Sequence, residues 1–160
     1  MSWRRVIAYG LLPGLALLLA FAGGFLKWWE GSVRDAEVAR AETVQAATDG
    51  TITMLSYKHD TVEKELGAAQ DRLTGQFKDA YGSLVHDVVI PGSRQKQISA
   101  VATVAAASSL SADANHGVVL VVVNQTVTVG KDAPTSTVSR VRVTLDKLGG
   151  RWLISQFDAI

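Results

Sequence analysis

The sequence predicts an α+β protein in which one transmembrane helix precedes helices packed on a four-stranded antiparallel sheet. Residues 6–26 form a run of 21 residues without a charge. Apolar residues then recur every three or four positions up to residue 84, which is the period of a helix. Beyond residue 97 the period changes to two, which is the period of a strand. Helices and strands in separate runs are typical of an α+β fold.

The uncharged run has the length and the flanks of a membrane anchor. A helix rises about 1.5 Å per residue, so the run covers about 30 Å, the thickness of the hydrocarbon core of a bilayer. Arg4 and Arg5 precede it, and Trp28 and Trp29 follow where an interfacial aromatic belt belongs. Because basic residues favour the cytoplasmic side, we expect a single-pass protein of the cell (inner) membrane. The expected order is a cytoplasmic N-terminus (1–5), a transmembrane anchor (6–29), a helical stalk (30–48) and an extracytoplasmic, periplasmic domain (49–160).

A cleaved secretory signal is the alternative interpretation of the N-terminus. The triplet Ala20-Phe21-Ala22 has the small-x-small pattern of a cleavage site. However, the apolar run continues beyond the triplet to Leu26 and the two tryptophans. A signal peptide does not require that extension, so the anchor is favoured.

Two helical segments are expected after the anchor. The first covers residues 32–57, with a weakly apolar face formed by Ala41, Val44, Ala47, Thr51 and Leu55. The second has a stronger face, formed by Val62, Leu66, Ala69, Leu73, Phe77, Tyr81 and Leu84. Gly75 is expected to divide this segment into two shorter helices, and Pro91-Gly92-Ser93 is expected to end the helical half.

Four strands are expected in the second half. They cover residues 97–107, 118–129, 138–145 and 151–157, separated by a polar turn (108–117), a loop (130–136) and the hairpin turn Gly149-Gly150. Residues 118–123 are six consecutive aliphatic residues, which predicts cover on both faces of the sheet at that end. Phe77, Tyr81, Val143 and Trp152 are expected in one core between the helices and the sheet.

Composition excludes several classes of function. Of 16 basic and 15 acidic residues, two basic ones are Arg4 and Arg5, which leaves a net charge of −1 on the rest of the chain. No basic cluster occurs there, so no nucleic-acid partner is expected. The chain has no cysteine, which excludes disulfides, thiolate metal sites and cysteine nucleophiles.

The candidate catalytic residues are few. The histidines stand in His59-Asp60, in His86-Asp87 and alone at His116, and no two have the spacing of metal ligands on one element. Neither a Gly-x-Ser-x-Gly elbow nor a glycine-rich phosphate loop after a strand occurs. We therefore expect no catalytic, metal or cofactor-binding residues and no enzymatic activity.

Partner contacts are expected in the anchor. Small residues allow membrane helices to approach closely, although glycines are also common in such helices for no specific reason. The expected partner-binding residues are Gly10, Gly14, Gly23, Gly24, Trp28 and Trp29.

Three short motifs, in order along the chain, resemble those of actinobacterial Mce-associated membrane proteins. They are Leu55-Ser56-Tyr57, the nonapeptide Leu73-Thr74-Gly75-Gln76-Phe77-Lys78-Asp79-Ala80-Tyr81, and Gly150-Arg151-Trp152-Leu153-Ile154. Together with the anchor and the middle strands, the resemblance covers nearly the whole chain. One departure is Tyr57-Lys58-His59, where the family has a Tyr-Asp-Tyr-like run.

The resemblance implies a cone-like α+β fold with a curved sheet, shared with ketosteroid isomerase-like proteins and with a periplasmic scaffold domain of type IV secretion systems. It implies a non-enzymatic accessory subunit that stabilises or links the components of an Mce-type importer of fatty acids or sterols in the mycobacterial envelope. The implied partners are the lipid bilayer, the permease and Mce proteins, and a lipid cargo. The alternatives are a ketosteroid isomerase-like lipid-binding domain or enzyme, with His86 or Asp87 as its candidate group, and a secretion-type envelope scaffold.

Overall fold

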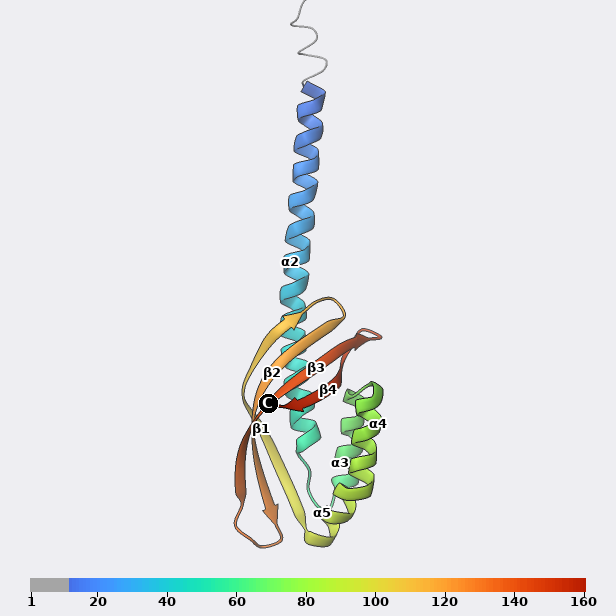
Figure 1. Ribbon diagram of the computed structural model, residues 1–160, viewed down its shortest axis with the longest axis vertical. Coiled ribbons are helices and arrows are strands. Elements are labelled where there is room, and N and C mark those ends of the chain that lie inside the picture. The colour runs from blue at the N-terminus through green and yellow to red at the C-terminus, as the bar shows by residue number, and fades with distance from the viewer. Residues whose placement is uncertain (1–11) are drawn as a thin grey trace, which may run out of the picture. The chain divides into compact units, whose positions relative to one another are not determined.

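The helices precede a four-stranded antiparallel sheet, as the sequence predicts (Figure 1). The computed structural model describes residues 12–160, and over residues 12–32 only the path of the backbone. Residues 38–160 form one compact unit. The helices are α2 (Leu12–Leu55), α3 (Val62–Ala69), α4 (Gly75–Leu84) and α5 (Ile90–Lys96), with a 3₁₀ turn, η2 (Gln70–Arg72), and a π-helical segment, η3 (Val85–Val89). The strands are β1 (Ile98–Ala112), β2 (His116–Val129), β3 (Thr135–Leu148) and β4 (Arg151–Ala159).

The strands form a meander in which each pairs with its neighbour in the chain, in the order β1-β2-β3-β4. The predicted turn at Gly149-Gly150 is confirmed, and it joins β3 to β4. Both glycines have a positive φ, of 57° and 76°. A two-residue hairpin with a positive φ at both central positions matches the right-handed twist of the strands, and glycine adopts it without a steric cost.

One face of the sheet packs against helices and forms the core. The fully buried aliphatic residues of the sheet on this face are Val119, Val121, Val123, Val143, Leu145 and Ile154. Val62 and Leu66 of α3 are equally buried. Tyr81 of α4 donates a hydrogen bond from its hydroxyl to the carbonyl of Met54 in α2 at 3.0 Å. Tyr81 and Val143 therefore belong to the buried core as predicted, and Phe77 and Trp152 are half-buried side chains packed against it.

The buried face of α2 differs from the prediction. Ala47 and Thr51 are fully buried as expected, but Ala41 is exposed and Thr43 is fully buried instead. The reason is that this face is built from small residues: a Cβ added to Gly50 would stand 2.5 Å from Ile154 Cδ1. Apolar periodicity does not reveal a face whose members are Thr, Gly and Ala. At the other end of the helical half, Leu84, the last member of the predicted apolar face, is 54% exposed, and Val85 at the start of η3 is buried instead.

The helix breaks are predicted correctly at one place and wrongly at another. Gly75 begins α4 with φ of 63°, so the expected division into two helices is confirmed. The expected end at Pro91 is wrong, because Pro91 lies in the first turn of α5, where proline is tolerated. The helical half ends instead at Gln97, which has φ of 52°.

The turn between the first two strands is much shorter than the predicted 108–117. The β1 strand continues to Ala112 and β2 begins at His116. The carboxylate of Asp113 accepts hydrogen bonds from the backbone N–H groups of Asn115 and His116, both at 2.8 Å. An aspartate that bonds the backbone two and three residues ahead forms a tight turn, so the serines before it are free to continue the strand.

The predicted cover on both faces of β2 is also wrong within the described residues. Val119, Val121 and Val123 face the core, whereas Val118, Leu120 and Val122 point to the opposite face and are half-buried. We call this opposite face, with Val118, Leu120 and Val122 of β2 and Arg140 and Arg142 of β3, the outer face. Register places Leu120 directly beside Arg142 and Val122 beside Arg140.

The predicted anchor, residues 6–29, begins in residues 1–11, which lie outside the described residues, and continues where only the backbone is described. Among the described residues, no helix is both long and apolar enough to cross a membrane.

Candidate functional site

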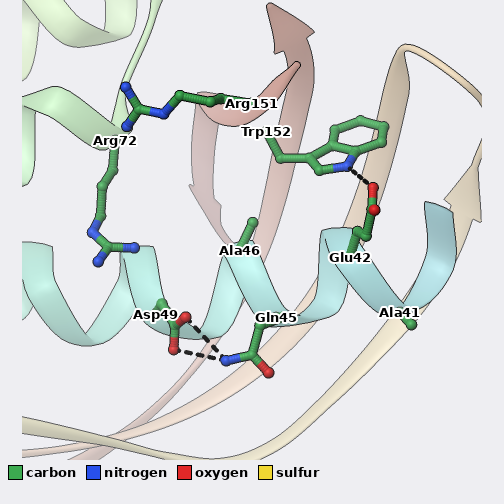
Figure 2. A pocket seen from close by; sticks show the side chains of 8 residues that line it. All are labelled: Ala41, Glu42, Gln45, Ala46, Asp49, Arg72, Arg151 and Trp152. Atoms are coloured by element: carbon green, nitrogen blue, oxygen red, sulfur yellow. Dashed lines mark hydrogen bonds between the residues drawn. The ribbon is translucent and has the colours of Figure 1, made fainter. Parts of the chain in front are cut away.

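An open cleft of about 560 Å³ lies between α2 and the beginning of β4 (Figure 2). We call it the α2–β4 cleft. It is lined by Ala41, Glu42, Gln45, Ala46, Asp49, Arg72, Arg151 and Trp152. The residues from α2 recur at spacings of three and four, so they share the helix face next to the buried one. Arg151 and Trp152 follow the Gly149-Gly150 turn, which sets the direction in which β4 begins.

One end of the cleft is organised around Glu42. Its carboxylate accepts a hydrogen bond from the Trp152 indole nitrogen at 2.8 Å (Figure 2). It accepts a second hydrogen bond from Lys147 Nζ at 3.1 Å. Lys147 Nζ also lies 5.3 Å from the centre of the Trp152 ring, within the range of a cation–π contact. The Trp152 N–H, and after it Lys147, lower the pKa of Glu42 below its ordinary value. Glu42 is therefore held as a carboxylate that fixes the orientation of the indole.

The other end of the cleft carries two guanidinium groups. Arg72 from η2 and Arg151 from β4 lie on the side away from Trp152 in Figure 2. Arg151 donates a hydrogen bond to the carbonyl of Asp71 at 3.2 Å, which fixes it against η2. In the part of the chain that the structure describes, neither arginine makes an ion pair. Asp49, by contrast, is bonded to Gln45 at 3.0 Å, one turn along α2.

The cleft can bind a surface that carries both positive and negative charges, because it has a carboxylate at one end and two guanidinium groups at the other. The cleft offers an indole ring and two arginines, which are residue types enriched at protein interfaces, beside two alanines and a fixed carboxylate. Among the described residues, no three His, Cys, Asp or Glu side chains come together as metal ligands would.

The histidines lie apart from the cleft. His86 bonds Asp87 at 2.8 Å, with 85% and 69% of the two side chains exposed, so these candidates for an acid–base role do not lie in an apolar pocket. His59 Nδ1 lies 3.2 Å from Ser99 Oγ. His116 bonds Asp146 of β3 at 2.8 Å, a pairing that its position in the sequence did not indicate.

The partner-binding role of the six residues in the anchor stays a prediction. Gly10 lies outside the described residues, and Gly14, Gly23, Gly24, Trp28 and Trp29 belong to the part of α2 of which only the backbone is described. Sequence reasoning assigned Trp152 to the core and missed the cleft. Glu42, Gln45 and Asp49 recur every three or four residues, and this spacing could have indicated a polar helix face. Nothing in the local sequence indicated that Arg72 would lie near Arg151.

The three motifs that carried the resemblance join the elements to one another. Leu73 pairs with Ile154, and the Thr74 N–H donates to the Ile154 carbonyl at 2.9 Å, so the second and third motifs meet. Tyr57 exchanges two backbone hydrogen bonds of 2.8 Å with Ala100 in β1. These contacts hold the helices to both edges of the sheet, so the motif residues have structural roles in the fold.

The fold is shared with solved domains of several bacterial proteins, one of them from a type IV secretion system. An IcmL-like type IV secretion system protein of Legionella pneumophila matches with a TM-score of 0.65 and 9% identity, over 76% of this chain and 91% of that one. The periplasmic domain of DotI matches at 0.61 with 17% identity, over 73% and 91%. Agrobacterium tumefaciens VirB8 matches at 0.60 with 12% identity, over 75% and 90%. At such identities the likeness concerns the fold alone.

The chain belongs to the family described as "Uncharacterized protein Rv1363c/MT1408-like", which matches residues 8–160. It is 68% identical over 160 residues, the full length of both chains, to "Outer membrane protein Rv1973" of Mycobacterium tuberculosis. It is 34% identical to "Uncharacterized protein Rv1362c" of the same species, over 99% of this chain and 75% of the relative.

Proposed function

We propose that the protein is a non-enzymatic subunit of a membrane assembly in the cell envelope, and that its α+β domain binds other subunits. The observation that carries this proposal is the fold shared over about three-quarters of the chain with domains of secretion-system proteins, one of them described as periplasmic. The name of the 68% identical relative, an outer membrane protein, supports a place in the envelope. The α2–β4 cleft, with its half-buried tryptophan and two arginines, supplies a surface of the required kind.

The finer proposal is an accessory subunit of an Mce-type importer of fatty acids or sterols. Its support is the order of the three motifs, which resembles that of Mce-associated membrane proteins. Its partners would be the permease and Mce proteins. A secretion-type scaffold is the second candidate, and the fold likeness favours it directly. The two candidates differ in the partners that each requires.

We also propose that residues 6–29 anchor the protein in the cell membrane with the N-terminus in the cytoplasm. The uncharged run and the preceding arginines support this orientation. The relative's name refers to the outer membrane, so membrane fractionation distinguishes the two locations. Reporter fusions after Ile160 should be active outside the cytoplasm, and the full-length protein should fractionate with the cell membrane. A mature N-terminus at Gly23 would instead show a cleaved signal.

Co-purification of the tagged full-length protein from its own membrane tests the function. Permease and Mce proteins among the recovered partners would support the transporter proposal, and secretion-system subunits would support the second candidate. A matched variant with residues 1–30 replaced by an unrelated single-pass anchor separates the contributions of anchor and domain. Recovery of the monomeric chain without partners, with its envelope location intact, would contradict both candidates.

A further inference from the structure

The outer face is unusual for one side of an antiparallel sheet. Where one face packs on a core and the other faces water, the outward positions are normally polar. Here Val118, Leu120 and Val122 occupy three successive outward positions of the central strand β2. Within residues 38–160, the helices pack on the opposite side of the sheet (Figure 1). The apolar column is therefore partly open to solvent.

The neighbouring strands give this column one small flank and one basic flank. On β1 the residues across from Val122 and Leu120 are Ala106 and Ser108. On β3 they are Arg140 and Arg142, both exposed and both without an ion pair among the described residues. Asp158 of β4 lies beside Arg142 in register but makes no ion pair with it in the described part of the chain. The outer face thus combines apolar contact area with two cations that are free to bind.

A hollow of about 550 Å³ continues the column at its lower-numbered end. Val118 and Thr144 line it together with the His116–Asp146 pair, and the first residues of α4 border it beyond β4. Apart from Val118 and Gly75 its lining is polar, so the hollow fits a polar side chain at one end of a segment that lies on the apolar column.

We propose that the outer face binds an acidic, amphipathic segment of a partner protein. Its apolar side chains pack on Val118, Leu120 and Val122, and its carboxylates bind Arg140 and Arg142. Charge decides among the possible occupants. A second copy packed face to face about a two-fold axis would bring the arginines of both copies to the same interface, where like charges oppose binding. Two arginines alone bind an anionic membrane only weakly, because such binding typically requires a larger basic cluster.

This inference rests on the proposed function, because it specifies how the domain holds a subunit. The full-length protein is expressed in its own cells with photoreactive benzoylphenylalanine in place of Leu120. The matched probe position is Val88 of η3, which is 60% exposed and lies outside the outer face. A cross-link from position 120, and not from 88, to a peptide rich in Asp or Glu is expected.

Charge reversal then tests the role of the arginines. Arg140→Glu with Arg142→Glu should reduce the cross-link by at least about tenfold, since like charges at an interface cost several times the thermal energy. Lys64→Glu with Lys131→Glu changes the net charge equally at exposed sites off this face and should leave the cross-link intact. When the partner's acidic residues are replaced by lysines, the cross-link to the variant with Arg140→Glu and Arg142→Glu should be restored. If the reversed variant does not fold, as measured by circular dichroism, Arg140→Gln with Arg142→Gln replaces it, with the same direction of change expected.

Several outcomes would overturn the inference. Three concern the cross-link from position 120: it does not form, it joins a second copy of the chain, or charge reversal leaves it unchanged. The fourth is that the cross-linked material is all lipid and the purified protein binds phosphatidylglycerol vesicles. Failure here is separable from failure of the proposed function. If the reversed variant still co-purifies with its membrane assembly while the cross-link is unaffected, the subunit role stands and the contact lies elsewhere, in the α2–β4 cleft or the anchor.

Discussion

Thr43 of α2 and Gly117 of β2 are in direct contact: a Cβ atom added to Gly117 would stand 2.5 Å from Thr43 Cγ2. Both residues are buried, and Thr43 is fully so. The Thr43 hydroxyl donates to the Arg40 carbonyl at 3.0 Å, which fixes the direction of its methyl group. This contact, with that of Gly50 on Ile154, holds α2 closer to the sheet than a helix with larger side chains could lie.

Gly117→Ala should therefore destabilise the domain by about 1–3 kcal/mol, the usual cost of inserting a methyl group into a packed core. Urea unfolding followed by circular dichroism measures the change. The variant should unfold at a lower midpoint with an unchanged slope, because the strain affects the folded state.

Thr43→Ser provides the matched test, because it removes Cγ2 and keeps the hydroxyl bond. Combined with Gly117→Ala, it should recover most of the lost stability, so that the two changes are not additive. Additive effects would show that the added methyl group is accommodated elsewhere and that this contact does not set the position of α2.

Trp152→Ala should destabilise the domain by less than the roughly 3–5 kcal/mol that loss of a fully buried aromatic residue costs. The sequence placed Trp152 in the core, but the ring is half-buried and bonded to Glu42. Thermal unfolding measures the effect. Trp152→Phe is the control that retains an aromatic surface and removes the N–H donor, and its effect should be smaller. A Trp152→Ala protein that does not fold would contradict the marginal position of the ring.

The sequence predicted those parts of the fold that depend on the spacing of apolar residues and on local backbone preferences. The four strands and the break at Gly75 follow from a change of period and from glycine's access to positive φ, both of which are local properties. The buried face of α2 did not follow, because Thr43 and Gly50 are buried for their small size. Pro91 was misread because a proline that ends one helix and a proline in the first turn of the next have the same local sequence signal.

The candidate sites were less predictable for a physical reason. Glu42 and Trp152 are 110 residues apart, and only the folded chain brings them to 2.8 Å. Pairing of β2 with β3 places the arginines beside the apolar column of the outer face. The continuous aliphatic run in β2 predicted cover on both faces of the sheet. The helices of this domain cover only one face, and a partner on the outer face would cover the other.

Two glycines in neighbouring helical segments should respond oppositely to alanine. Gly67 lies inside α3 with open space around its Cβ position, so Gly67→Ala should stabilise the domain by about 1 kcal/mol. Gly75 also has open space, but its φ is 63°, so Gly75→Ala should destabilise it by about 1–2 kcal/mol. Chemical denaturation measures both. Stabilisation by Gly75→Ala would show that α4 begins with a different backbone conformation.

Two carboxylates make the folded state sensitive to acid. Hydrogen bonds from the backbone N–H groups of Asn115 and His116 lower the pKa of Asp113, and the Trp152 indole and Lys147 lower that of Glu42. A carboxyl group whose pKa is lower in the folded than in the unfolded state contributes stability above its unfolded pKa. That contribution is lost as the pH falls through the folded pKa, here below about pH 4.

Asp113→Asn should reveal this contribution as a difference that depends on pH. The amide oxygen that replaces the carboxylate can still accept both backbone hydrogen bonds, so the turn is retained while the titrating charge is removed. At pH 7 the variant should melt below wild type, because hydrogen bonds to a charged acceptor are stronger. The gap should close as the pH falls below about 4, where Asp113 itself becomes protonated. Melting temperatures of both proteins between neutral and acid pH measure the gap, and a gap that stays constant would mean that the Asp113 carboxylate gains nothing from the turn.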